Sequence, residues 1–270
     1  MFLCPICKEE LIKYNNSLKC PKNHCYDFAK SGYVNLLNPG KKNNAKAGDS
    51  KEMIDARTSF FRCEAYKPIS DKLSEIVSKI DNSIIVDAGC GDGYYTKNLA
   101  KTHTESIVFG FDMSKFGCEH GAKEAKYEGL QNIHYAVSNI FELPLLDCST
   151  DVIISLFAPV ANEENARLLK NDGHMIVVSA GIDHLNGLKA LLYDKPYPNE
   201  EKFLLFENFD LIGVENLKYN TTIDGNETIK ALFTMTPYYH RTSLQDKEKL
   251  NTVNSFKTTI EVNFALYRKK

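Results

Sequence analysis

The sequence of 270 residues contains no tryptophan, and it has no apolar run approaching the roughly 20 residues that a membrane-spanning helix requires. No apolar run near the N-terminus is long enough for a signal peptide. We therefore expect a cytoplasmic protein without a membrane partner. The formal net charge is only −2, which excludes an overall attraction to polyanions, so any contact with nucleic acid must come from a local patch.

Such a patch is present at the N-terminal end. Residues 1–51 contain nine lysines and four acidic residues, a formal charge of +5, and the remainder carries −7. With 43% hydrophobic residues, the chain can bury one full α/β core and leave a short segment outside it. We expect one main domain with a small basic appendage.

Eight cysteines in a cytoplasmic α/β chain are better explained as metal ligands and small buried residues than as a disulfide framework. Two knuckles, C-P-I-C at positions 4–7 and C-P-K-N-H-C at positions 20–25, are about a dozen residues apart. This spacing is typical of a treble-clef or ribbon-like zinc site, in which two tight turns present thiolates to one tetrahedral ion. Three ligands follow directly, namely Cys4, Cys7 and Cys20. The fourth is either His24 or Cys25.

The stretch from Ser83 to Tyr95, S-I-I-V-D-A-G-C-G-D-G-Y-Y, organises the rest of the chain. A short apolar run ends in an acid and is followed by three glycines two residues apart, which predicts a buried parallel strand that turns sharply into a helix. Glycine accepts positive φ and has no β-carbon, so a ligand can lie against bare backbone at the start of that helix. The pattern D-x-G-x-G-x-G lacks the G-x-G-x-x-G fingerprint of dinucleotide-binding proteins.

A second apolar strand ends in Asp112, nineteen residues after Gly93. In an open α/β sheet, a carboxylate at the end of the strand beside the glycine turn can accept both hydroxyls of a ribose. An acid before the glycines, a ribose acid after the next strand and the lack of a phosphate cradle together resemble the S-adenosylmethionine-dependent methyltransferases of the Rossmann-like class. The alternative is a glycine-rich turn with structural carboxylates in some other α/β protein.

This resemblance implies S-adenosylmethionine as the cofactor and a Rossmann-like α/β fold with a seven-stranded sheet, closed by an antiparallel strand over residues 258–267. After the predicted third strand, residues 133–137, a short acid or amide usually meets the adenine edge. Ser138 and Asn139 occupy that place, and we expect Asn139 to be the contact. The residues expected to bind the cofactor are Asp87, Gly89, Gly91, Gly93, Tyr94, Asp112 and Asn139.

Residues 151–156 form the predicted fourth strand, and Phe157, Ala158 and Pro159 form its exit loop. In this architecture the carboxyl end of that strand lies beside the transferred methyl group, because the strand adjoins the first one where the strand order reverses. We expect these three residues to hold the substrate base. Pro159 fixes the loop, the carbonyls around Ala158 accept from the base edge, and Phe157 stacks on the base. The alternative for Phe157 is a core aromatic residue that caps the strand.

A more specific resemblance follows the second knuckle. Residues 26–37, Y-D-F-A-K-S-G-Y-V-N-L-L, together with the two knuckles, resemble the RlmA-type methyltransferases, which methylate N1 of a guanine in a hairpin of 23S ribosomal RNA. Residues 48–57, G-D-S-K-E-M-I-D-A-R, and the aromatic-Ala-Pro sequence at 157–159 match the same family. The zinc ligands implied by the resemblance are Cys4, Cys7, Cys20 and His24. Cys25 is then a bystander.

The expected organisation is a zinc-binding RNA-recognition module at residues 1–38, a linker and connecting helix at 39–69, and a methyltransferase domain at 70–270. Residues 38–44 are polar and predict the linker. Asp49 or Ser50 can cap a helix that begins at about Lys51. Arg57 would lie on this helix, either as an RNA or cofactor contact or as part of a surface ion pair.

The function implied by the resemblance is transfer of a methyl group from S-adenosylmethionine to guanine N1 in a hairpin of 23S ribosomal RNA, by an enzyme that forms a homodimer. Two alternatives remain open. A methyltransferase of small molecules would have the same glycine turn, although the zinc module and the N-terminal charge excess argue against it. A zinc-ribbon RNA-binding protein without catalytic activity would keep the fold but would not bind S-adenosylmethionine.

Overall fold

The computed structural model describes residues 2–40, 48–201 and 203–270. Most of the predicted linker falls on residues 41–47, which lie outside the described residues, as does Met1 of the predicted zinc module. In the described chain, no helix is both long enough and apolar enough to cross a membrane.

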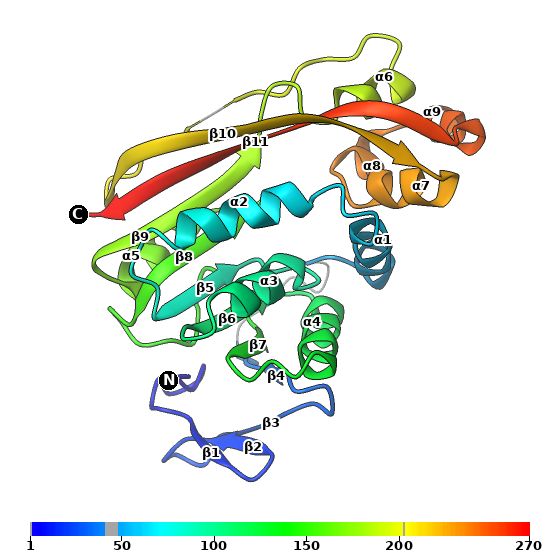
Figure 1. Cartoon of the computed structure of the whole chain (residues 1–270). Coiled ribbons are helices and arrows are strands. Elements are labelled where there is room, and N and C mark those ends of the chain that lie inside the picture. The colour runs from blue at the N-terminus through cyan, green and yellow to red at the C-terminus, as the bar shows by residue number, and fades with distance from the viewer. Residues whose placement is uncertain (1, 41–47, 202) are drawn as a thin grey trace.

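An eight-stranded sheet forms the centre of the molecule (Figure 1). Its strands, in spatial order, are β10 (Phe209–Asp224), β11 (Ser255–Lys269), β9 (Leu169–Ala180), β8 (Thr150–Leu156), β5 (Ile84–Ala88), β6 (Ile107–Asp112), β7 (Ile133–Val137) and β4 (Val34–Asn35). The strands from β9 to β4 are parallel, whereas β10 and β11 form a long antiparallel hairpin. The order reverses between β5 and β8, as the sequence predicts for a doubly wound sheet.

The prediction of seven strands was wrong by one. The additional strand is β4, in which Val34 pairs with Ala136 and Asn35 with Val137 of β7. The chain leaving the N-terminal module runs along β7, and its backbone continues the sheet by one short strand. A strand of two residues has no measurable alternation of apolar and polar positions, so the sequence pattern could not reveal it.

Nine α-helices are described: α1 (Lys51–Phe61), α2 (Lys67–Val77), α3 (Tyr94–Thr102), α4 (Lys115–Tyr127), α5 (Asn162–Leu168), α6 (Asn186–Leu192), α7 (Asn226–Thr234), α8 (Tyr238–Arg241) and α9 (Leu244–Glu248), with a 3-10 turn at Lys249–Thr252. Ser50 caps α1 by accepting a hydrogen bond from the Met53 amide (3.3 Å). Helices α2, α3 and α4 cover one face of the sheet with buried residues such as Leu73 and Leu99. Helix α7 packs against α1 beneath the far end of the β10–β11 hairpin (Figure 1).

The N-terminal module covers the opposite face. Its own sheet is β1 (Ile12–Tyr14), β2 (Ser17–Lys19) and β3 (Cys25–Asp27), all antiparallel. Phe2 packs edge-on against Phe109 and Phe111 of β6, with ring centroids 5.4 and 6.2 Å apart. The connection from β7 to β8, residues 138–149, is described throughout and contains no helix. The module therefore supplies apolar cover on this face, and the two parts share one core.

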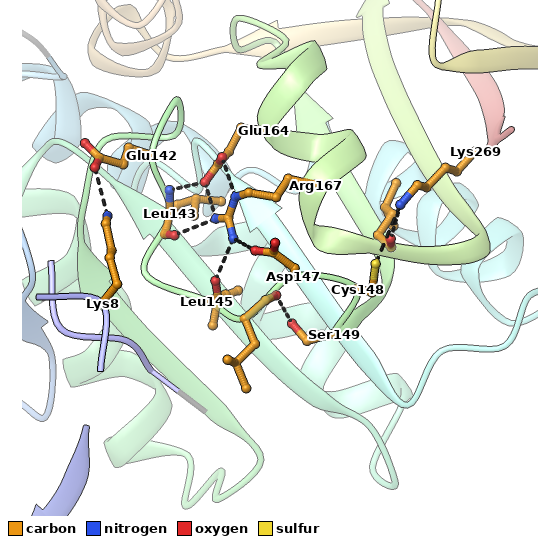
Figure 2. Close-up of polar contacts among 12 residues, drawn as sticks. Lys8, Glu142, Leu143, Leu145, Asp147, Cys148, Ser149, Glu164, Arg167 and Lys269 are labelled. Carbon is orange, nitrogen blue, oxygen red and sulfur yellow. Dashed lines mark hydrogen bonds and ion pairs between the residues drawn. The ribbon is translucent and has the colours of Figure 1, made fainter. Parts of the chain in front are cut away.

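The connection 138–149 is held in place by Arg167 of α5 (Figure 2). Arg167 donates hydrogen bonds to the carbonyls of Leu143 and Leu145, both at 3.0 Å, and pairs with Glu164 and Asp147. Glu164 in turn accepts from the Leu143 amide (2.5 Å).

The zinc module contacts the same connection. Lys8 forms an ion pair with Glu142 (2.8 Å; Figure 2), and the Leu3 amide donates to the Pro144 carbonyl (2.8 Å). Phe2 forms an antiparallel bridge with Leu145.

Candidate active site and zinc site

The carboxyl ends of β5, β6, β7 and β8 surround a cavity of about 300 Å³. Its volume is at the lower end of the range typical of small-molecule sites, roughly 300–1,000 Å³. Eight of the ten residues predicted to bind cofactor or substrate line it, namely Asp87, Gly89, Gly91, Asp112, Asn139, Phe157, Ala158 and Pro159. Gly93 and Tyr94 do not. They line a second, smaller hollow on the other side of Asp92, where Tyr94 stacks on Phe61 at 4.1 Å.

The glycine turn brings β5 close to the loop after β8. Gly89 has φ +97°, and a β-carbon there would lie 2.7 Å from the Ala158 β-carbon. No other residue fits this position without moving the exit loop, so the backbone of the turn is bare on its cavity side.

The Asp112 carboxylate is oriented by two backbone amides. It accepts hydrogen bonds from Ser114 (2.6 Å) and Gly91 (3.0 Å). Burial raises the pKa of Asp112, and these two hydrogen bonds oppose the rise because they favour the charged form. The carboxylate is thereby fixed at the end of β6, where a ribose is expected.

Asp87 is 2% exposed and accepts a hydrogen bond from the Thr96 hydroxyl (2.6 Å). Burial raises its pKa to about 7, against the stabilising effect of that hydrogen bond. Asp87 therefore ties the end of β5 to α3 and forms part of the cavity wall.

The exit loop of β8 places an aromatic ring in the cavity. Phe157 has φ +51°, a conformation that is strained for a bulky side chain, and it is 42% exposed. The ring therefore does not cap the strand inside the core, which was the alternative. The Ser155 hydroxyl lies within hydrogen-bond distance of the carbonyls of Ala158 (3.1 Å) and Pro159 (3.3 Å), and holds the loop.

The cavity contains residues that the sequence pattern did not indicate, notably Asp92 and Tyr95. Tyr95 is buried, and its hydroxyl has no hydrogen-bond partner among the described residues. For Arg57 the sequence left open an RNA or cofactor contact and a surface ion pair. The side chain lines the cavity, and its Nε donates to Asp49 (2.5 Å). The only local sequence signal for Tyr95 was its place as the second of two tyrosines after the third glycine.

An unsatisfied buried hydroxyl facing a cavity indicates that a ligand completes the site. The ordered Asp112 carboxylate and the bare backbone at Gly89 fit a nucleoside cofactor of the S-adenosylmethionine type. The residues present thus fit the cofactor that the fold implies.

The four predicted zinc ligands, Cys4, Cys7, Cys20 and His24, form one cluster whose ligand atoms all lie within 4.8 Å of one another. The Cys7 and Cys20 sulfurs are 3.6 Å apart, and His24 Nδ1 lies 3.4 Å from the Cys4 sulfur and 3.3 Å from the Cys20 sulfur. A tetrahedral ion with bonds of about 2.3 Å to sulfur separates its ligands by roughly 3.8 Å, so the cluster fits zinc.

The surroundings of the cluster favour His24 over Cys25 as the fourth ligand. Cys25 is exposed and lies near Asp27 (3.9 Å), outside the cluster. The Tyr26 hydroxyl contacts the Cys4 sulfur (3.4 Å), and the His24 amide donates to the Cys20 sulfur (3.3 Å), contacts that orient metal ligands.

Comparison with known proteins gives two family matches. Residues 2–46 match the zinc-ribbon family described as "RlmA, N-terminal", and residues 79–237 match the family described as "Methyltransferase domain".

Curated relatives match over most of the chain. The putative 23S rRNA (guanine-N(1)-)-methyltransferase YxjB of Bacillus subtilis (strain 168) is 29% identical over 98% of this chain and 96% of its own. The 23S rRNA (guanine(748)-N(1))-methyltransferase of Streptomyces fradiae is 27% identical over 82% of this chain and 79% of its own. A putative 23S rRNA (guanine-N(1)-)-methyltransferase of Micromonospora griseorubida is 30% identical over 67% and 66%.

Among solved structures, the YcgJ protein of Bacillus subtilis aligns with a TM-score of 0.50 and 18% identity, covering 74% of this chain and 98% of its own. This likeness shows the fold of the larger domain. The chain belongs to the family of methyltransferases in which an RlmA-type zinc ribbon precedes a Rossmann-like methyltransferase domain.

Proposed function

We propose that this enzyme transfers a methyl group from S-adenosylmethionine to N1 of a guanine in a hairpin of 23S ribosomal RNA. The observation that carries the proposal is the packing of the zinc ribbon onto the connection 138–149, whose first residues line the cavity. The three relatives that match two thirds or more of this chain are named as 23S rRNA guanine-N1 methyltransferases, which supports the same substrate.

The cavity residues divide between cofactor and base in this proposal. Asp112 accepts from the ribose hydroxyls and Asn139 meets the adenine. The glycine turn, including Gly93 and the first helical residue Tyr94, shapes the backbone against which the cofactor lies. When bound, S-adenosylmethionine supplies an activated methyl group.

The loop after β8 holds the target base. Phe157 stacks on the guanine, Pro159 fixes the loop, and the carbonyl of Ala158 keeps a lone pair for the base edge. Such positioning contributes most of the rate enhancement in a displacement of this kind.

The zinc ribbon, with residues 1–38 as the RNA-recognition module, contacts the RNA. Tyr14 is 60% exposed, and the Lys19 ammonium lies 4.6 Å from the centre of its ring. An exposed aromatic ring beside cations suits stacking on an unpaired base near phosphates. Residues 39–69 connect the module to the methyltransferase domain at 70–270.

We also infer that the enzyme is cytoplasmic and forms a homodimer. The outer strand β10 exposes apolar side chains at Leu211, Ile212 and Val214, which supports an association between chains. Light scattering coupled to size exclusion tests the dimer, which a monomeric mass at micromolar concentration would exclude.

The substrate is tested by incubating the enzyme with labelled S-adenosylmethionine and 23S ribosomal RNA from a strain that lacks the modification. N1 methylation blocks the Watson-Crick edge, so reverse transcriptase is expected to stop one nucleotide before the modified guanine. RNA with adenine at that position is the control and should give neither label nor stop.

Absence of label in naked RNA, despite measurable binding of the cofactor, would contradict the proposal for free RNA. Assembled ribosomal particles and small molecules would then be the next substrates to test. The position of a stop within the hairpin would identify the guanine.

A further inference from the structure

The charges in the cavity are unevenly distributed. Four aspartates line it, namely Asp49, Asp87, Asp92 and Asp112, whereas Arg57 is the only basic residue among the described lining residues. A cationic ligand suits this wall as a whole. The Arg57 guanidinium therefore either binds an anionic group of the ligand or forms only its ion pair with Asp49.

We propose that Arg57 and Asp92 bind the amino-acid end of S-adenosylmethionine, with the guanidinium on its carboxylate and the Asp92 carboxylate on its ammonium. This end is a zwitterion, and the sulfonium adds a further positive charge that the remaining aspartates match. The inference rests on the methyltransferase assignment and is independent of the RNA substrate.

The geometry of Arg57 leaves one edge of the guanidinium available. Asp49 accepts from Nε at 2.5 Å, and this is the only hydrogen bond made by the guanidinium within the described chain. The two terminal nitrogens therefore present the parallel N–H pair that a carboxylate accepts. Asp49 is itself fixed, because its carbonyl accepts from the Ser114 hydroxyl (2.7 Å) just after β6.

Asp92 lies in the glycine turn and is 6% exposed. Within the described chain, the only hydrogen bond to its carboxylate comes from the Tyr94 amide at 3.3 Å, which is long for a charged acceptor. Burial raises its pKa, and the positive charge of Arg57 opposes the rise. A ligand ammonium would supply the counter-charge that this buried carboxylate lacks.

Tyr95 provides a second, independent indication of a ligand. Its side chain is more than nine-tenths buried on the first turn of α3, lines the cavity, and leaves the hydroxyl without a partner within the described ranges. A buried hydroxyl without a hydrogen bond costs free energy unless a ligand accepts from it. The ligand carboxylate, an acceptor with two oxygens, can take this third donor.

The test is calorimetric binding of two ligands that differ only in the amino-acid end. S-adenosylhomocysteine has the carboxylate and ammonium, whereas 5′-methylthioadenosine has the same nucleoside and lacks both. Arg57→Gln should weaken S-adenosylhomocysteine binding by about 10- to 100-fold, typical of a lost charge-assisted pair, and change methylthioadenosine binding by less than about twofold.

Arg62→Gln is the matched control, because Arg62 directly follows the same helix and lines only the smaller hollow. It should leave both affinities unchanged. Asp49→Asn separates the ion pair from the ligand contact, since it keeps the guanidinium. It should lower S-adenosylhomocysteine affinity less than Arg57→Gln does.

Asp92→Asn and Tyr95→Phe extend the same comparison. Each should weaken binding of S-adenosylhomocysteine more than binding of methylthioadenosine. Equal losses for both ligands, with circular dichroism showing intact folding, would overturn the proposal, as would unchanged S-adenosylhomocysteine affinity in Arg57→Gln. If Arg57→Gln does not fold, Arg57→Lys keeps the charge and loses the paired N–H geometry. It must then show the selective loss, or the proposal fails.

Discussion

The rings of Phe157 and His184 lie with their centroids 5.8 Å apart, and this contact links the cavity to a buried polar chain. His184 Nδ1 accepts from the Glu261 amide (3.3 Å), so its Nε2 carries the proton and donates to the Tyr66 hydroxyl (3.1 Å). Burial lowers the pKa of His184 to about 4, which keeps the ring neutral at pH 7. Phe157 therefore rests against a rigid, uncharged neighbour.

Phe157→Ala tests whether the exposed ring serves the substrate. We expect kcat/KM for RNA methylation to fall by roughly 5- to 150-fold, the range of a lost base-stacking contact of about 1–3 kcal/mol. The thermal midpoint should change little, because the ring is partly exposed and its backbone is strained in the native state.

Phe116→Ala is the control for this change, since Phe116 is similarly exposed on α4 and does not line the cavity. Equal activity of the two variants would exclude a role for Phe157 in holding the base.

Short sequence patterns predicted most of the residues that line the cavity, because these residues lie in turns at the ends of strands. The glycines and the acid at Asp112 lie at the ends of adjacent parallel strands, and such ends always meet. Gly93 and Tyr94, at the start of α3, line the smaller hollow, whereas the next residue, Tyr95, lines the cavity. Successive helical residues project in directions about 100° apart, so neighbours in the sequence can face different hollows. The spacing of the glycines in the sequence does not show which residues after the turn face the cavity.

Contacts between segments far apart in the chain could not be predicted from the sequence. The zinc knuckles were evident from spacing, but nothing local shows that Phe2 packs against β6 or that Val34 extends the sheet. Arg57 and Asp49 are one pair on a helix and its preceding turn, and their position over the cavity depends on α1 packing against α4 and α7. Such contacts are set by the whole fold.

Cys4→Ser is expected to remove zinc and destabilise the shared core. Cys4 is fully buried in the same hydrophobic cluster as Phe2 and the β6 aromatics, so loss of the metal affects more than the ribbon. We predict less than one zinc per chain by mass spectrometry and a lower thermal midpoint by far-ultraviolet circular dichroism, with the same direction after chelation.

Cys25→Ser provides the comparison, because Cys25 is exposed and outside the cluster. It should retain one zinc per chain. Zinc loss in Cys25→Ser with retention in His24→Ala would show that the ligand assignment is wrong.

The raised pKa of Asp87 should make the free energy of unfolding depend on pH. Its pKa is about 7 in the folded protein and about 4 in an unfolded chain, so between these values the folded state binds the extra proton. The contribution of this carboxyl is therefore greatest below about pH 4 and is lost as the pH rises to about 7.

The free energy of unfolding, measured with urea, should fall by up to about 4 kcal/mol more in the wild type than in Asp87→Asn across this window. Asparagine can still accept from the Thr96 hydroxyl, so the variant keeps that hydrogen bond. Parallel pH profiles for the two proteins would contradict the assignment of the proton to Asp87.

Arg167→Met tests how far the connection 138–149 depends on one side chain. Methionine keeps most of the aliphatic length but removes the donors to Leu143 and Leu145 and leaves Glu164 without its cation. We expect a loss of about 2–4 kcal/mol in the free energy of unfolding, the usual cost of breaking a partly buried network.

Binding of S-adenosylhomocysteine by Arg167→Met should also weaken, because Asn139 and Phe141, near the start of the same connection, line the cavity. Lys170→Met is the control, since Lys170 forms a more exposed pair with Asp151 (2.6 Å), worth less than about 1 kcal/mol. If the two variants unfold at the same urea concentration, the Arg167 contacts do not anchor the connection. If Arg167→Met is destabilised but binds the ligand normally, the connection is anchored independently of the cavity wall.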